Sequence, residues 1–185
     1  RGPQLAEGLA ASGELQTLTL ITPHSGEIVD EYTQAFTAHM EAKGVAVRLE
    51  TVDVGGTGNV VRRLMEEAKL LTPGQPGKID VLWGGGTDPY IKLAGLGLLE
   101  PCPLPPEIDR GIPADWNGVV IKPAHHLYCG AAFAGFGIIV NREICAAKKL
   151  AEPRNWKDLA EPAFFGGFAN GDLRSSGAIK QCYES

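Results

Sequence analysis

The sequence lacks both a long hydrophobic run and an excess of basic residues. No apolar stretch approaches the roughly 20 residues that a membrane-spanning helix needs. Lysine and arginine number 17 against 22 aspartate and glutamate residues, which gives a formal net charge of −5. Because a nucleic-acid surface needs a basic stripe and none is present, a nucleic-acid partner is not expected.

Metal-binding and redox spacings of cysteine are also missing. The four cysteines, Cys102, Cys129, Cys145 and Cys182, contain no Cys-x-x-Cys pair, which argues against a zinc knuckle and against a thioredoxin motif. They suit buried thiols, or one or two disulfides in an exported protein. Three full pairings are possible, and the sequence does not choose among them.

Signatures of cofactor binding and catalysis are absent as well. The glycines at 84–86 do not continue into the Lys-Ser/Thr ending of a Walker loop or into a Gly-x-Gly-x-x-Gly fingerprint. There is no Gly-x-Ser-x-Gly elbow, no Cys-His signature and no pair of catalytic carboxylates. We therefore expect no cofactor and no enzymatic activity. The alternative is an α/β enzyme that uses His24 with Glu27 or Asp88 as acid and base.

What the chain does contain is a repeated order of apolar run, small-residue loop and helix-like stretch, in a composition of 24 glycines and 13 prolines. Strands are expected at 18–21, 47–54, 79–83 and 167–169, followed by loops at 22–26, 55–59, 84–89 and 172–177. In a parallel α/β sheet such loops emerge beyond the carboxyl ends of the strands, where ligands bind. Helix N-termini at that edge offer unpaired N–H donors. The pattern predicts a doubly wound α/β lobe that receives a ligand.

The helix after the first strand is expected to start with Ser25 as its N-cap and to end at Gly44. Its inward stripe is predicted from a four-residue spacing: Ile28, Tyr32, Phe36 and Met40. The continuously apolar run at 79–83 is typical of a strand in the middle of a parallel sheet.

A second helix is expected over 59–71. A third is predicted to begin at Asp88, as N-cap, with Pro89 at its first position, and to end near Leu99.

The later part of the chain indicates a connection and the start of a second lobe. Residues 128–140 form a long, glycine-punctuated apolar stretch, which is too long for a typical strand. A helical turn at 155–159, a strand at 166–169 and a final helix opened by Ser175 or Ser176 are then predicted.

Six motifs occur in an order that resembles the extracellular solute-binding proteins of ABC importers, in the branch with the periplasmic ferric-ion-binding proteins. They are Thr22-Pro23-His24, Ile79-Asp80-Val81-Leu82-Trp83-Gly84-Gly85-Gly86, Leu98-Leu99-Glu100-Pro101, Gly135-Phe136-Gly137-Ile138-Ile139-Val140-Asn141, Trp156-Lys157-Asp158-Leu159-Ala160-Glu161-Pro162 and Arg174-Ser175-Ser176-Gly177-Ala178. The resemblance implies a type II periplasmic-binding fold with two α/β lobes, an extended hinge and a ligand in the cleft between them.

By this resemblance the chain divides into a lead-in at 1–15, a first lobe at 16–134, a hinge crossing at 135–141 and the start of a second lobe at 142–185. It would be the amino-terminal portion of a longer protein. Family members act in the periplasm or otherwise outside the cytoplasm, catalyse nothing and deliver a captured solute to a membrane permease.

The segment Arg174-Ser175-Ser176-Gly177-Ala178 is the first candidate binding site. Hydroxyls and unpaired amides at a helix start, with a cation beside them, suit an oxyanion or a carboxylate. The resemblance implies contact with a bound anion for Ser176, Gly177 and Ala178. The alternative is simple N-capping by Ser175 or Ser176.

A second candidate site is Gly85-Gly86-Thr87. The glycines would let a ligand lie against the backbone, and Thr87 would supply a hydroxyl. The alternative is conformational, since glycine satisfies positive φ after a strand.

His24 is the third candidate. Its family counterpart binds iron, which makes His24 a candidate metal ligand, and with Ser25 it is also a candidate hydrogen-bonding group for the solute. The alternative is an ordinary loop residue, and glycines stand here where the relatives carry a metal-binding glutamate.

These observations predict the solute-binding component of an ABC transporter that captures a small anionic or metal–anion ligand, iron among the candidates. The alternatives are the α/β enzyme described above and a ligand-sensing domain of a receptor.

Overall fold

A computed structural model of the chain describes residues 15–72, 74–174 and 176–184. Its centre is a three-stranded parallel sheet made of β1 (Gln16–Ile21), β2 (Val47–Val52) and β3 (Val81–Leu82), in the order β2-β1-β3. β1 pairs along its whole length with β2, from Gln16 opposite Val47 to Ile21 opposite Val52. The mixed α/β class with a parallel sheet, predicted from the sequence, is confirmed.

β1, and not β3, is the central strand of this sheet. Leu20 and Ile21 are 6% and 0% exposed, because β1 has a neighbour on both sides. The expectation that 79–83 lies in the middle of the sheet is therefore wrong for the described residues. The apolar run does not report the order of strands, and Val81 of β3 is 37% exposed. β3 pairs at Val81 and Leu82, and the N–H groups of the residues flanking it also bond to β1.

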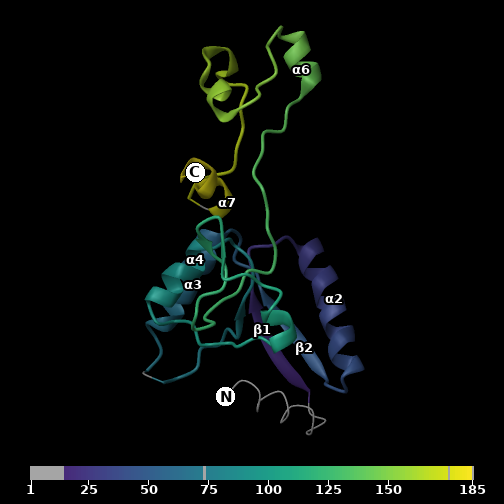
Figure 1. Cartoon of the computed structure of the whole chain (residues 1–185), viewed down its shortest axis with the longest axis vertical. Helices are drawn as coiled ribbons and strands as arrows, with labels where there is room; N and C mark the ends of the chain where they lie inside the picture. Colours follow the sequence, from purple (N-terminus) through teal and green to yellow (C-terminus); the bar gives the residue numbers. More distant parts are fainter. Residues whose placement is uncertain (1–14, 73, 175, 185) are drawn as a thin grey trace.

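Helices cover both faces of the sheet. α2 (Gly26–Ala42) lies on one side, and α3 (Thr57–Ala68) and α4 (Asp88–Gly95) lie on the other (Figure 1). The chain moves from β1 outward to β2 and then back across β1 to β3. Since parallel crossovers are right-handed, these two opposite movements place their helices on opposite faces. The boundary between β1 and β3 is thus a topological switch point.

α2 buries a different stripe from the predicted one. Ile28 and Tyr32 are 41% and 59% exposed, whereas Val29 is buried and Phe36 and Met40 are half-buried. A strict four-residue spacing advances about 40° per step around a helix of 3.6 residues per turn, so it winds off the buried face. Ser25 is the N-cap as expected, and Gly44, with φ of 75°, follows the helix in the left-handed conformation.

The ends of the next two helices differ from expectation by several residues. α3 begins at Thr57, two residues early, and stops at Ala68, with Val60 fully buried. α4 has Thr87 as its N-cap, so the prediction of Asp88 as the cap is wrong, and it stops at Gly95 before Gly97 turns left-handed.

A one-turn helix, α5 (Pro106–Asp109), and a small antiparallel hairpin of β4 (Asp115–Trp116) and β5 (Val119–Val120) follow.

The chain then leaves the sheet along an extended connection and comes back to it. Residues 128–141 pair with no strand in this described stretch, and α6 (Arg142–Ala147) lies far from the sheet (Figure 1). Two 3₁₀ turns follow, η1 (Trp156–Ala160) and η2 (Pro162–Phe164), before α7 (Gly177–Glu184) returns toward α3 and α4.

The predicted turn at 155–159 is confirmed. Asn155 and Asp158 form a reciprocal capping box at the start of η1. The predicted strand over 166–169 is wrong. Gly166 adopts a φ of 69° in a turn, and the residues after it are irregular.

Candidate functional site

The loops after β1 and β3 meet at the switch point. The imidazole of His24 lies 4.6 Å, centroid to centroid, from the ring of Trp83, which in turn lies 4.9 Å from the ring of Tyr32. Thr22 is 2% exposed, and its Oγ1 accepts a hydrogen bond of 3.2 Å from the His24 backbone N–H. A side chain on Gly84 would overlap the imidazole, so the glycine is required for this close approach.

Three helices begin around these loops without a side-chain cap. Ser25, Gly56 and Thr87 are the N-caps of α2, α3 and α4, and none of these described residues makes a capping bond through its side chain. The first-turn amides of a helix need other partners in that case, and the helix dipole favours an anion as one of them. The carboxylates Glu27 and Asp88 occupy the first turns of α2 and α4.

The first turn of α3 carries no such charge, because it reads Thr-Gly-Asn-Val. The first turn of α3 therefore opposes an added negative charge less than the first turns of α2 and α4 do, although the Asp53 carboxylate accepts a hydrogen bond of 2.8 Å from the Gly55 N–H in the loop before it.

Thr57 joins the two stretches that the sequence singled out. A Cβ on Gly85 would stand 3.0 Å from Thr57 Cγ2, and a Cβ on Gly177 would stand 3.1 Å from Thr57 Cβ and Oγ1. Both contacts are too close for a larger residue to fit without movement. The structure thus brings Gly85 after β3 and Gly177 at the start of α7 together on one threonine at the start of α3.

The start of α7 is occupied by its own cap. Ser176 Oγ accepts a hydrogen bond of 3.3 Å from the Ile179 backbone N–H, which matches the capping alternative for this serine. Lys180 Nζ reaches to 4.0 Å from Asp88 Oδ2 of α4. Ala178 is exposed, and Ser175 lies outside the described residues. Anion contact by this segment stays a prediction.

Arg174 makes an ion pair within its own loop. Its Nη2 lies 2.7 Å from Asp172 Oδ2, and its side chain is 90% exposed. The hydrogen bond between the two raises the pKa of Arg174 and lowers the pKa of Asp172. The guanidinium therefore already has a balancing carboxylate beside it.

The remaining candidates lie at the same edge with differing exposure. His24 and Thr87 are half-buried, while Ser25 and Gly86 are exposed. No group of three or more histidine, cysteine, aspartate or glutamate side chains that could hold a metal is present among the described residues. Metal binding by His24 stays a prediction that has no support from neighbouring ligands.

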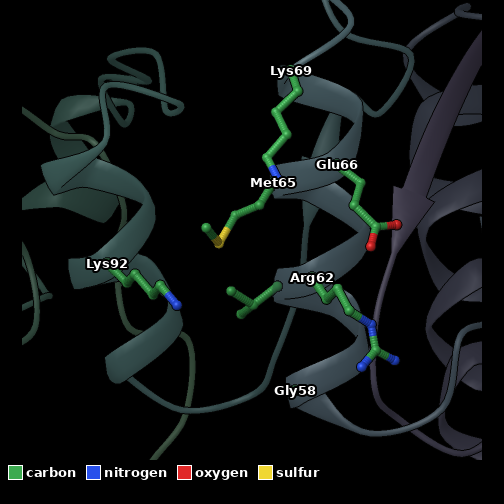
Figure 2. Close-up of a pocket in the computed structure, with 7 residues that line it drawn as sticks. Gly58, Arg62, Met65, Glu66, Lys69 and Lys92 are labelled. Atoms are coloured by element: carbon green, nitrogen blue, oxygen red, sulfur yellow. The ribbon is translucent and has the colours of Figure 1, made fainter.

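A hollow of about 390 Å³ lies between the outer faces of α3 and α4, away from His24. Figure 2 shows Met65 extending from α3 into the gap that Lys92 of α4 faces. The lining residues are Gly58, Val61, Arg62, Met65, Glu66, Lys69 and Lys92. Its charged groups are all exposed, so solvent screens them and the hollow has no fixed geometry for a ligand.

Within the described residues no helix is both long and apolar enough to cross a membrane.

Comparison with known proteins identifies the fold. No family model matches the chain. An uncharacterized protein of Haemophilus influenzae (strain ATCC 51907 / DSM 11121 / KW20 / Rd) is 30% identical over 182 residues, covering 94% of this chain and 47% of that protein. The solved structure of the periplasmic binding protein P5PA is similar with a TM-score of 0.55 at 21% identity, over 88% of this chain and 47% of that chain.

The chain thus has the α/β fold of a periplasmic binding protein and spans about half the length of the proteins it matches. The similarity to this structure supports the periplasmic-binding-protein fold but not membership of the ferric-ion-binding branch. The type II assignment and the hinge at 135–141 stay predictions.

Two residues of the site were missed by sequence reasoning. Thr57 lies in one of the small-residue loops that follow a strand, which was the available signal, but nothing local shows that two other loops converge on it. Trp83 was not among the candidate binding residues. Its position as the last apolar residue before Gly84 places it at the strand's carboxyl end, next to His24.

Proposed function

We propose that this chain forms part of a solute-binding protein of an ABC importer that captures a small anionic ligand outside the cytoplasm and delivers it to a membrane permease. The ligand would lie at the carboxyl edge of the sheet, between the loops after β1 and β3 and the start of α7. The periplasmic-binding-protein fold supports this role, and the residues at the switch point support the charge of the ligand.

The observation that carries the proposal is the uncapped start of α3. Its first-turn amides, the Thr57 hydroxyl and the close backbone of Gly85 form one surface without a carboxylate in the helix turn. An anion there gains from both N–H donors and the helix dipole. Gly177 packs on the same threonine, so a ligand held at Thr57 would also lie beside the start of α7.

We further propose that binding occurs without chemical turnover. The enzyme alternative needs a carboxylate that works with His24. Among the described residues no hydrogen bond or ion pair joins His24 to Glu27 or to Asp88. The ring of His24 contacts Trp83, and Asp88 Oδ2 lies 4.0 Å from Lys180 Nζ. This arrangement supports holding a ligand more than moving a proton.

The test is a titration of the purified protein with small anions, followed by the fluorescence of the tryptophans and by calorimetry. Phosphate, sulfate, a dicarboxylate and a ferric–citrate complex would be compared with uncharged sugars. We expect saturable binding of at least one anion. Because Trp83 lies at the proposed site, this binding should change the tryptophan fluorescence. The mass of the recovered ligand should be unchanged.

Thr57→Val keeps the shape of Thr57 and removes its hydroxyl. A lost hydrogen bond to a charged ligand costs about 1.5–3 kcal/mol, so binding should weaken by roughly 10- to 150-fold. Thr37→Val, in the middle of α2, is the matched control and should bind normally. Equal affinity in Thr57→Val and the control would remove α3 from the site. Binding of uncharged solutes only would refute the anion assignment. Chemical conversion of the ligand would refute the absence of turnover.

A further inference from the structure

We propose that Cys102 and Cys129 form a disulfide that ties the loop after α4 to the segment leading out of the sheet lobe. The backbone N–H of Cys102 donates a hydrogen bond of 2.9 Å to the carbonyl of His126, three residues before Cys129. A turn closed by the His126 N–H on Pro123 and a bend at Leu127 keep the next residues near that contact. The structure holds both residues as thiols, and both are exposed to an oxidant.

Backbone bonds also anchor the segment on the other side of Cys129. The Gly130 N–H donates to the Ile121 carbonyl at 2.9 Å, and a Cβ on Gly130 would press on the Ile121 side chain at 2.5 Å. Cys129 is therefore held between two fixed points, His126 and Gly130. A disulfide needs cysteines whose backbones are already close, and both ends of this one are positioned before it forms.

The electrostatics agree with this proximity. Cys129 is exposed overall, but partial desolvation of its thiol raises its pKa; the neighbouring Cys102 thiol raises it further, while Lys122 lowers it. An effect of the Cys102 thiol on Cys129 requires a short distance between the two residues, which agrees with the backbone contact.

The other two cysteines sit elsewhere in the fold. Cys145 is buried on α6, at the far end of the extended connection, and Cys182 lies on α7 (Figure 1). Of the possible cysteine pairs, the structure favours Cys102–Cys129.

The chemistry is a thiol–disulfide exchange with a small-molecule disulfide such as oxidised glutathione. One cysteine thiolate attacks the disulfide and displaces one glutathione thiolate, which forms a mixed disulfide on the protein. The second cysteine thiolate attacks the protein sulfur of this mixed disulfide and displaces the second glutathione as a thiolate. Two protons and two electrons leave the pair of thiols, and the oxidant is reduced to two thiols. This pairing is a property of the fold and does not depend on the proposed transport role.

The test is peptide mapping of the purified protein after equilibration with excess oxidised glutathione, followed by alkylation and trypsin digestion without reduction. Each cysteine falls in a separate tryptic peptide: 93–110, 111–142, 143–148 and 181–185. We expect 93–110 joined to 111–142, with no glutathione on either peptide.

Cys182→Ser is the matched control and should keep the cross-link, whereas Cys129→Ser should lose it and leave Cys102 as a glutathione adduct. Three outcomes would each overturn the proposal. They are four remaining thiols, separate glutathione adducts on both Cys102 and Cys129 of the wild type, and linkage of 93–110 to a peptide other than 111–142.

Discussion

Replacing Gly85 by alanine tests whether Thr57 and Gly85 are in contact at the proposed site. Two costs should add. Gly85 has a φ of 92°, a region that costs an L-residue about 1–3 kcal/mol. The new Cβ would also stand 3.0 Å from Thr57 Cγ2 and 3.2 Å from its Oγ1, and such overpacking costs about 1–3 kcal/mol. Gly85→Ala should therefore lower the free energy of unfolding by about 2–6 kcal/mol, measured by urea titration.

A control and a double-mutant cycle separate the two costs. Gly97 has a φ of 67° and open space around it in the described part of the protein, so Gly97→Ala should show the backbone cost alone. Thr57→Ala removes both close atoms and leaves Pro23 Cγ at an ordinary 3.5 Å. In that background Gly85→Ala should lose less stability, with a coupling energy of about 1–3 kcal/mol. Equal losses in both backgrounds would show that Thr57 does not press on Gly85, and the site geometry would be wrong.

Three further predictions concern local contacts. Asn155→Ala removes the acceptor of the capping box, so it should lower the free energy of unfolding by about 0.5–2 kcal/mol in urea titration, and no change would contradict the cap. The hydrogen bond from Lys122 lowers the pKa of Asp109. The stabilisation from this pair is therefore present above the ordinary aspartate pKa and is lost as pH falls through the lowered pKa. Asp109→Asn should lose less stability than the wild type on acidification, and an equal loss would argue against the pair. Burial raises the pKa of Tyr90 to about 12, so its stabilisation is present below the ordinary tyrosine pKa near 10 and is lost as pH rises toward 12. Spectrophotometric titration should show one late-ionising tyrosine that Tyr90→Phe abolishes, and its persistence in that variant would refute the assignment.

Local features were those that the sequence could predict well. The start of α2 after Ser25, its end before Gly44 and the capped turn at Asn155 were all expected. Each depends on residues within one turn of each other, where side-chain capping and glycine conformation act. The alternation of strands and helices likewise predicted a parallel α/β sheet, because helical and extended periodicities differ over a few residues.

The wrong predictions concern features that depend on contacts between segments distant in sequence, which a local pattern does not report. The apolar run of β3 looked like a central strand, yet β1 is central, since strand order depends on which segments pair. The stripe through Ile28 and Tyr32 was regular in sequence, but the sheet contacts the face of Val29 instead. The apolar residues at 166–169 formed no strand, because a strand needs a neighbouring edge to bond with.

The sequence by itself determined the fold class, the glycine-rich loops at the carboxyl edge and the candidate residues His24, Gly85 and Gly177. Only the tertiary structure decided that Thr57 lies between the two glycines and that Trp83 lies against His24. These contacts join loops that are tens of residues apart. The crossover of α3 over β1 and the return of α7 bring them together, and no spacing within a single segment encodes that convergence.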